Sequence, residues 1–287
     1  MEIKPKKSLG QNFLRDKSIV NKIIESANLN ADDFVIEVGP GTGILTEELV
    51  KMAGKVLAIE IDHTLIKPLQ KKFENKKNVE ILSGDILKIN LPALLGHEMS
   101  KYKVIANLPY YITSPIIRLF LETEMPPQEM ILMVQKEVAE RITASPSEIP
   151  AESRSAKRIS RGKPGQMSIL AVSVQYYAQA EIIFEVNRKC FDPVPEVDSS
   201  VIKISNLAYR QAGLKSQISK MEQNKFFRVV RAGFCAKRKT LSNNLSNSLH
   251  LDKKEVEEKI KAVGFKPTAR AQELSVEDWK NIAELLI

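Results

Sequence analysis

The sequence predicts a Rossmann-like α/β fold with a doubly wound parallel sheet, followed by a small all-helical domain. Three observations lead to this prediction. Short β-rich runs alternate with amphipathic helical runs between about residues 16 and 140. The first β-rich run ends in a cluster of glycines, and from about residue 217 onward the pattern is wholly helical. Strands that alternate with helices at this spacing are typical of parallel β-α-β units.

The expected elements follow in chain order. Asp16 is a suitable N-cap for a helix whose apolar residues recur at helical spacing up to Ala27. We expect the main strands at residues 34–38, 56–59, 79–82, 103–106 and 130–134, with helices at 44–53, 63–73 and 112–122. Residues 145–167 indicate a long basic loop, and strand character resumes at 182–186 and 200–204.

A change of composition near Asn206 predicts the boundary between two domains. We expect residues 1–206 to form the ligand-binding α/β domain and residues 207–287 to form the helical domain. Helical periodicity in the second domain predicts three helices, at residues 226–245, 253–263 and 276–286.

Composition narrows the classes of protein. The chain of 287 residues is 43% hydrophobic and 27% charged, and it contains no apolar run long enough for a membrane span. No apolar signal core follows the basic N-terminus, so we expect a cytoplasmic protein. The two cysteines and three histidines are scattered, which argues against a disulfide framework or a metal site.

The charge balance favours a nucleic-acid partner. Lys and Arg number 43 against 35 Asp and Glu, a formal net charge of +8. A positive balance suits a polyanionic partner, although many basic proteins bind no nucleic acid.

A glycine loop and two acidic residues predict a nucleoside site. Residues 37–43 read E-V-G-P-G-T-G at a strand-to-helix turn, with Gly39 and Gly41 able to let a ligand approach the backbone. The G-x-G-x-G spacing is more compact than the dinucleotide fingerprint and suits a nucleoside that carries an amino acid. Glu60 ends the second strand, where a carboxylate can bind ribose hydroxyls, as in NAD or S-adenosylmethionine sites.

The third strand adds residues that suit the adenine ring of such a nucleoside. Asp85 ends this strand, and its carboxylate can accept a hydrogen bond from the exocyclic amine of an adenine. Ile61 and Ile86 flank the two acidic residues and can enclose the ring from its two faces.

The segment Asn107-Leu108-Pro109-Tyr110 predicts catalysis on an amine in a planar ring. The lone pair of an adenine N6 amine is delocalised, and acceptors that hold its N–H groups out of conjugation localise that lone pair. The Asn107 side-chain oxygen and the Leu108 carbonyl can act as these acceptors, and Pro109 keeps Leu108 extended. Tyr110 can stack on the target base. Transfer of a methyl group from a sulfonium needs positioning and oriented dipoles rather than a metal.

Eight motifs in the same order make the chain similar to the ribosomal RNA adenine N6-methyltransferases, and most similar to the bacterial small-subunit (16S) adenine dimethyltransferases. The motifs comprise residues 7–14, the glycine loop, 59–62, 84–85, 107–110, 134–141, 191–199 and 234–241. The resemblance implies the methyltransferase form of the fold and S-adenosylmethionine as the cofactor. It also implies dimethylation of two adjacent adenosines near the 3′ end of 16S RNA, late in small-subunit assembly.

The resemblance assigns site residues as well. It implies that Gln11, Asn12 and Leu14 close over the cofactor, and that Gly39, Glu60, Asp85 and Asn107 contact it. The chain departs from the family pattern between Ala144 and Leu170, where its loop is longer and more basic. That loop is either a solvated insertion or an RNA contact.

Cations in the helical domain predict an RNA-facing stripe. Arg228, Arg231 and Arg238 recur at helical spacing, and Lys237 and Lys239 widen the band. A solvated amphipathic helix is the alternative, and the resemblance favours phosphate contacts that are sensitive to salt. We expect the partner to be small-subunit RNA within a pre-assembled subunit, and the protein to be a monomer.

Three alternatives remain open. An NAD-dependent dehydrogenase requires the longer glycine spacing and a catalytic His or Tyr-Lys pair, which are not evident. A non-catalytic RNA-binding assembly factor keeps the fold without using Asn107. A large-subunit RNA methyltransferase of the macrolide-resistance type shares residues 11–13, whereas the longer match over 10–14 and the cations at 237–239 favour the small-subunit enzyme.

Overall fold

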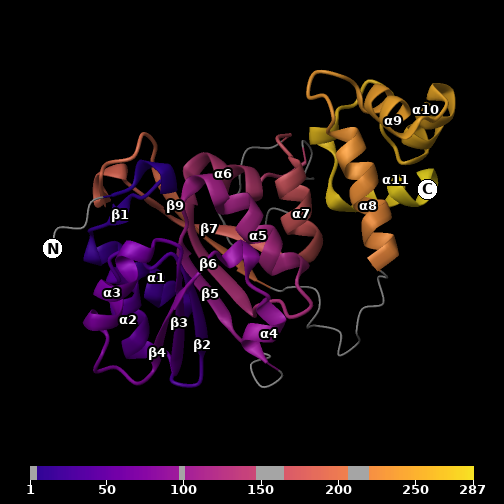
Figure 1. Cartoon of the computed structure of the whole chain (residues 1–287). Helices are drawn as coiled ribbons and strands as arrows, with labels where there is room; N and C mark the ends of the chain where they lie inside the picture. Colours follow the sequence, from indigo (N-terminus) through magenta and orange to yellow (C-terminus); the bar gives the residue numbers. More distant parts are fainter. Residues whose placement is uncertain (1–4, 97–100, 147–164, 206–219) are drawn as a thin grey trace. The chain divides into compact units, whose positions relative to one another are not determined.

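The computed structural model describes residues 5–96, 101–146, 165–205 and 220–287, which form two compact units (Figure 1). The first unit takes its residues from Met1–Ala139 and Ala178–Ala208, and the second from Glu140–Tyr177 and Tyr209–Ile287. The expected division into 1–206 and 207–287 is therefore corrected for residues 140–177. The described residues of this stretch, 140–146 and 165–177, belong to the second unit because Met167, Ala171 and Val172 are buried in its apolar core.

The first unit is built on a seven-stranded sheet in the order β4-β3-β2-β5-β6-β9-β7. Strands β4, β3, β2, β5 and β6 are parallel, as predicted. In chain order, the seven strands are β2 (Phe34–Val38), β3 (Lys55–Glu60), β4 (Val79–Ser83), β5 (Lys103–Asn107), β6 (Glu129–Gln135), β7 (Gln179–Val186) and β9 (Ser199–Ser205).

The sheet is mixed rather than wholly parallel, which corrects the sequence prediction. Strand β9 pairs antiparallel with both β6 and β7. Residues 187–198 connect β7 to β9 and contain a 3-10 turn and the short strand Phe191–Asp192 but no α-helix. Parallel neighbours are usually joined by a helical crossover, so a connection without one agrees with the antiparallel pairing. The catalytic motifs all lie on the parallel part of the sheet, so this correction leaves their common edge unchanged.

Helices cover the sheet because its strands are apolar on both faces. Helices α1 (Lys17–Ala27) and α2 (Ile44–Met52) share one buried cluster with Val35, Ile105 and Ile131 of the sheet. Asp16 caps α1 as predicted, since its side chain accepts from the Ser18 N–H. The other helices before residue 143 are α3 (His63–Lys72), α4 (Leu91–Leu95), α5 (Thr113–Glu122) and α6 (Lys136–Ile142).

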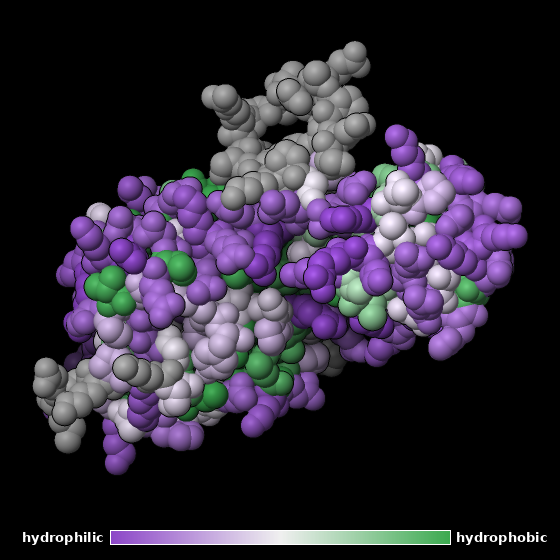
Figure 2. Space-filling model, turned by 90° about the horizontal axis from the view of Figure 1, so that it is seen from above, coloured by the Kyte–Doolittle hydropathy of each residue, from purple (hydrophilic) through white to green (hydrophobic). Residues whose placement is uncertain are grey.

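The second unit is helical around its own core, which is centred on the buried Trp279. Its helices are α7 (Ile169–Tyr177), α8 (Lys220–Gly233), α9 (Leu241–Leu249), α10 (Lys253–Ala262) and α11 (Val276–Leu286). No described helix is long and apolar enough to cross a membrane. On the face seen in Figure 2, hydrophobic residues form only small patches among the described residues.

The single helix expected at 226–245 is wrong, because the chain breaks between α8 and α9. Gly233 ends α8 directly against the Trp279 ring, where a larger residue has no room. The Asn244 amide then donates to the carbonyls of Gly233 and Ala236, at 2.7 and 3.0 Å. Thr240 caps the new helix by accepting from the Asn243 N–H. Side-chain caps of this kind stop one helix and start the next.

A nearly buried network of charges holds the amino-terminal edge of the sheet. The Lys103 ammonium lies 3.2 Å from an Asp33 carboxylate oxygen and 3.4 Å from one of Glu129. It also donates to the carbonyls of Ala27 and Asn28, at the end of α1. Lys203 pairs with the second Glu129 oxygen at 2.7 Å. This network joins α1, β5, β6 and β9 at the edge opposite the carboxyl ends of the parallel strands.

We expect Lys103→Met to lower the free energy of unfolding by about 3 kcal/mol, because it leaves two nearly buried carboxylates without their shared cation. Urea denaturation measures the change. Lys55→Met is the matched control, since its pair with Glu80 is long, at 3.9 Å, and Lys55 is 46% exposed. The control is expected to cost under about 1 kcal/mol. Equal losses in both variants would contradict a structural role for the network.

Candidate active site

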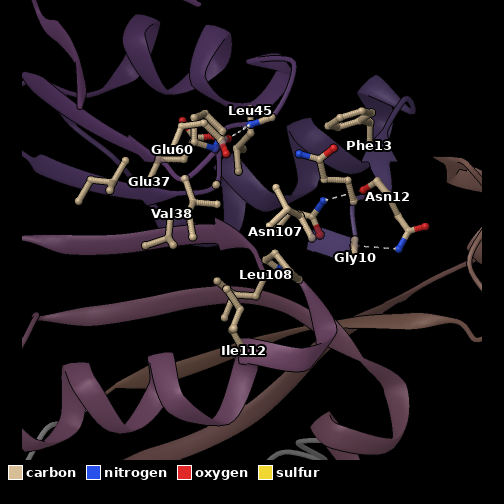
Figure 3. Close-up of a pocket in the computed structure, with 18 of the residues that line it drawn as sticks. Gly10, Asn12, Phe13, Glu37, Val38, Leu45, Glu60, Asn107, Leu108 and Ile112 are labelled. Carbon is tan, nitrogen blue, oxygen red and sulfur yellow. Dashed lines mark hydrogen bonds between the residues drawn. The ribbon is translucent and has the colours of Figure 1, made fainter. Parts of the chain in front are cut away.

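A single pocket gathers the sequence-predicted site residues at the carboxyl edge of the parallel strands (Figure 3). Ligands of doubly wound sheets bind at this edge, where the strand order reverses. Here the reversal lies between β2 and β5, which are neighbours although two strands separate them in sequence. The predicted residues that line the pocket are Gln11, Asn12, Leu14, Gly39, Gly41, Glu60, Ile61, Asp85, Ile86, Asn107, Leu108, Pro109 and Tyr110.

The glycine loop between β2 and α2 forms one wall of the pocket. Gly39 and Gly41 have φ angles of 70° and 60°, a conformation that favours glycine. A Cβ added to Gly39 would meet no atom within 4 Å, so the backbone there faces open space. A Cβ on Gly41 would lie 3.1 Å from the Phe13 ring. The loop therefore leaves room for a ligand at Gly39 and is closed by Phe13 at Gly41.

Glu60, at the end of β3, is a buried carboxylate with both oxygens hydrogen-bonded to backbone. One oxygen accepts from the Gly41 N–H at 3.0 Å and the other from the Asp62 N–H at 2.8 Å. Burial raises the pKa of Glu60, and these backbone hydrogen bonds counteract the rise. Each carboxylate oxygen keeps a further lone pair, so the group can still accept hydrogen bonds from ribose hydroxyls.

The strand order separates the two ends of the predicted ligand site. Asp85, next to β4, lies at one end of the pocket, and Asn107, on β5, lies toward the other. Strands β3 and β2 lie between these two residues, so they are not side by side. Three strand spacings amount to roughly 14 Å, which suits an elongated ligand lying across the strand ends. A nucleoside that carries an amino acid has this form.

The Asp85 carboxylate is already engaged locally. One of its oxygens accepts from the Leu87 N–H at 3.1 Å, and the other lies 3.7 Å from the Lys88 ammonium. Buried Ile86 and half-exposed Ile61 line the same part of the pocket. The residues present therefore fit an adenosine, with apolar side chains for the ring and carboxylates at its amine and ribose.

The Asn107 amide is oriented by the backbone of the N-terminal segment. Its nitrogen lies 3.5 Å from the Asn12 carbonyl oxygen, and Figure 3 shows the side chain reaching toward Asn12. A carbonyl only accepts hydrogen bonds, so the amide must turn its NH₂ group toward Asn12. The Asn107 side-chain oxygen is left to accept from a substrate amine.

Hydrogen bonds also hold the motif residues that follow Asn107. The Leu108 N–H donates to the Met133 carbonyl at 3.1 Å, which fixes the Asn107–Leu108 peptide directly before the carbonyl that is the predicted acceptor. No described residue donates a hydrogen bond to the Leu108 carbonyl. The Tyr110 hydroxyl lies 3.1 Å from the Ser199 hydroxyl on β9, and this contact positions the ring at the pocket.

Several lining residues were not assigned from the sequence. Phe13 and Phe191 both line the pocket and belong to the short paired strands β1 (Phe13–Leu14) and β8 (Phe191–Asp192). Their pairing joins segments far apart in the chain, so no local pattern revealed it. Leu45 and Ile112 also line the pocket, at the starts of helical segments that were predicted only for packing.

Glu37 is the other residue that sequence reasoning left without a role. It is 1% exposed, and one of its carboxylate oxygens is buried without a hydrogen-bond partner. Burial raises the pKa of Glu37 to about 8, and the Glu60 charge adds to the rise. The glycine motif contained this residue, but only the structure shows that its carboxyl group is buried.

The five predicted RNA-contacting residues lie in the second unit and are exposed. Arg228 and Arg231 are on α8, whereas Lys237, Arg238 and Lys239 lie in the turn before α9. The cations thus belong to two different local structures rather than to one helical stripe. The predicted basic loop falls largely on residues 147–164, which lie outside the described residues.

The fold and the pocket define a nucleoside-binding enzyme of the Rossmann-like methyltransferase class. A family model described as ribosomal RNA adenine dimethylase matches residues 3–287. The chain belongs to that family, and it is therefore an S-adenosylmethionine-dependent methyltransferase.

Individual relatives match this chain over nearly its full length. A ribosomal RNA small subunit methyltransferase A from Dehalococcoides mccartyi is 40% identical over 280 residues, covering 98% of this chain and 88% of the relative. The crystal structure of a dimethyladenosine transferase from Plasmodium falciparum is 26% identical with a TM-score of 0.73, covering 94% and 95% of the two chains. That of the 23S rRNA methyltransferase ErmE is also 26% identical, with a TM-score of 0.69 and coverage of 96% and 99%.

We expect the stability of the protein to fall as pH rises from about 4.5 to about 8, because the folded state keeps the Glu37 proton over this range and the unfolded state does not. Glu37→Gln removes the part of this dependence that Glu37 contributes, whereas the raised pKa of Glu60 contributes its own part in both proteins. Between the two ends of this pH range, the free energy of unfolding of the variant should rise relative to that of wild type by on the order of a few kcal/mol. Thermal unfolding of the ligand-free protein at several pH values measures this gain.

Exposed Glu284→Gln serves as the control for the loss of one carboxyl group, and its pH profile should follow that of wild type. A Glu37→Gln profile parallel to wild type would show that the Glu37 carboxyl is ionised in the folded protein throughout.

Proposed function

We propose that this chain dimethylates the N6 amines of two adjacent adenosines near the 3′ end of small-subunit (16S) ribosomal RNA, in the cytoplasm and late in subunit assembly. The observation that carries the chemistry is the orientation of the Asn107 amide, whose nitrogen faces the Asn12 carbonyl and whose oxygen is left for a substrate amine. The small-subunit substrate is supported by a relative of that name that is 40% identical over nearly the whole chain.

The residues present divide the binding of the methyl donor between them. Glu60 would bind the ribose, Asp85 the adenine amine, and the open backbone at Gly39 the amino-acid end; all three line the pocket. When bound, S-adenosylmethionine supplies an electrophilic methyl group on a sulfonium. The Gly39 loop and Asn107 lie at the ends of neighbouring strands, so Asn107 would hold the acceptor amine close to the amino-acid end of the bound donor.

The protein's part in the reaction is to hold and orient the target amine. The Asn107 side-chain oxygen and the Leu108 carbonyl accept from its two N–H groups and turn its lone pair toward the methyl carbon. A bound donor would give up its methyl group to this nitrogen as the carbon–sulfur bond breaks and S-adenosylhomocysteine leaves, and the nitrogen would lose one proton to solvent. Tyr110, held by Ser199, stacks on the extruded base. A second transfer to the same amine repeats these steps.

The second unit provides the hold on RNA. Its exposed cations Arg228, Arg231, Lys237, Arg238 and Lys239 form no salt bridge with any described residue, so each can contact a phosphate. Phosphate contacts position the substrate without reading its sequence. The protein acts as a monomer on a pre-assembled small subunit.

We expect Asn107→Ala to lower kcat for methyl transfer by about 10²–10³-fold, the usual cost of removing one oriented dipole from a reacting centre. The assay uses labelled S-adenosylmethionine with undermethylated small subunits and maps the modified bases. Thermal unfolding checks that the variant folds. Asn78→Ala, at a hydrogen-bonded site away from the pocket, controls for the loss of an amide. Label confined to large-subunit RNA would overturn the substrate, and wild-type transfer by Asn107→Ala would overturn the role of Asn107.

We expect the double variant Arg228→Gln/Arg231→Gln to weaken binding to small-subunit RNA and to flatten its salt dependence, by roughly one unit of log–log slope for each phosphate that the variant no longer binds. Filter binding across a salt series measures both effects. Lys253→Gln/Lys280→Gln removes the same charge from exposed Lys253 and half-buried Lys280 on other helices, and it should leave the slope unchanged. Identical slopes for both double variants would argue against a specific contact at α8.

A further inference from the structure

The Asp62 carboxylate accepts more hydrogen bonds than its role as a helix cap requires. It is the N-cap of α3, where its side chain accepts from the Thr64 N–H at 3.0 Å and the Thr64 hydroxyl at 2.6 Å. A cap needs only this much. Yet the same buried carboxylate also accepts from the Lys6 ammonium at 2.6 Å and from the Gln11 side-chain amide at 2.8 Å. Two extra donors therefore reach Asp62 from a distant part of the chain.

Lys6 and Gln11 are themselves joined in a closed turn. The Lys6 N–H donates to the Gln11 side-chain oxygen at 2.7 Å, and the Lys6 carbonyl accepts from the N–H groups of Leu9 and Gln11. Both polar ends of the Gln11 amide are thus occupied within the protein. Gln11 lines the pocket, but its side chain is engaged in holding the turn against Asp62.

The turn leads straight into the residues that face the reacting centre. Gly10 lies against the Tyr111 ring, which a Cβ on that glycine would approach to 3.2 Å. The next residue but one, Asn12, presents the carbonyl that orients the Asn107 amide. Beyond Asn12, the pairing of β1 with β8 and the salt bridge of Arg15 with Asp192, at 2.9 Å, hold the C-terminal end of this segment.

The segment is therefore tied at both ends, and Asp62 is the tie at its beginning. The Asp62 N–H also donates to the Glu60 carboxylate at 2.8 Å, so the residue that ties the segment is itself bonded to a residue that lines the pocket. Burial alone would raise the pKa of Asp62, but hydrogen bonds from Lys6, Thr64 and Gln11 hold it well below its usual range. Asp62 is consequently charged at neutral pH, and its bond to Lys6 is charge-assisted on both sides.

We propose that Asp62 is a positioning residue which, through Lys6 and Gln11, clasps residues 6–12 over the cofactor pocket and so keeps the Asn12 carbonyl in place to orient Asn107. The effect on cofactor binding follows from the pocket geometry. Only the effect on the orientation of the target amine rests on the proposed function.

The test separates the clasp from the helix cap by changing Lys6 rather than Asp62. Lys6→Met removes the ammonium and leaves the Asp62–Thr64 cap intact, whereas Lys6→Arg retains a cation. Lys51→Met is the matched control, because Lys51 forms an exposed ion pair of the same length, 2.6 Å, with Glu48 on α2. The readouts are calorimetric affinity for S-adenosylhomocysteine and amide hydrogen exchange of residues 5–14 in the ligand-free full chain.

We expect Lys6→Met to weaken S-adenosylhomocysteine binding about tenfold, in line with the loss of one charge-assisted hydrogen bond. It should also speed amide exchange at Leu9 and Gln11, with little change in thermal unfolding. Lys6→Arg should stay within about twofold of wild type, and Lys51→Met should match wild type. Adding Lys6→Met to Asp62→Asn should cost little further affinity, because the two changes remove the same interaction.

Wild-type affinity and wild-type exchange in Lys6→Met would overturn the proposal and leave Asp62 as a helix cap only. Both readouts are independent of RNA. If they shift as expected while small subunits receive no methyl groups, the proposed substrate fails and the clasp stands. If methylation proceeds and neither readout shifts, the clasp fails and the proposed function stands.

Discussion

The parallel pairing of β3, β2 and β5 is the constraint on which the rest of the molecule depends. Helices bury the strands on both faces, so polar side chains can reach a ligand only where the strands end. Parallel pairing brings those ends to one edge, and the order β4-β3-β2-β5 spreads them in a row. Glu60, the glycine loop and Asn107 thereby lie in succession along one elongated pocket.

Burial at this edge has an electrostatic consequence. Glu37 and Glu60 lie at neighbouring strand ends, nearly inaccessible to water, and their pKa values are raised. Backbone N–H groups of Gly41 and Asp62 offset the cost for Glu60, whereas one oxygen of Glu37 has no partner. The pocket therefore keeps one carboxylate prepared for hydroxyl groups and a second that favours its protonated form. Such unequal environments for neighbouring carboxyl groups are typical of functional sites.

The N-terminal segment completes what the sheet begins. The sheet supplies only one side of the pocket, and residues 9–14 supply another. Their position is set by partners distant in sequence, namely Asp62 at one end and β8 at the other. The same segment orients the Asn107 amide, so closure of the pocket and preparation of the reacting centre depend on one stretch of backbone.

The sequence alone determined the α/β alternation, the strand ends that carry Gly39, Glu60, Asp85 and Asn107, and the family, because these depend on local periodicity and on short motifs. Only the tertiary structure decided which strand ends are neighbours, that β9 runs antiparallel, and that residues 140–177 join the helical unit. It also revealed that Phe191 lines the pocket, that Glu37 is buried and that the chain breaks between α8 and α9. Each of these rests on contacts between residues far apart in the chain or on a packed ring such as Trp279, and a local pattern does not contain them.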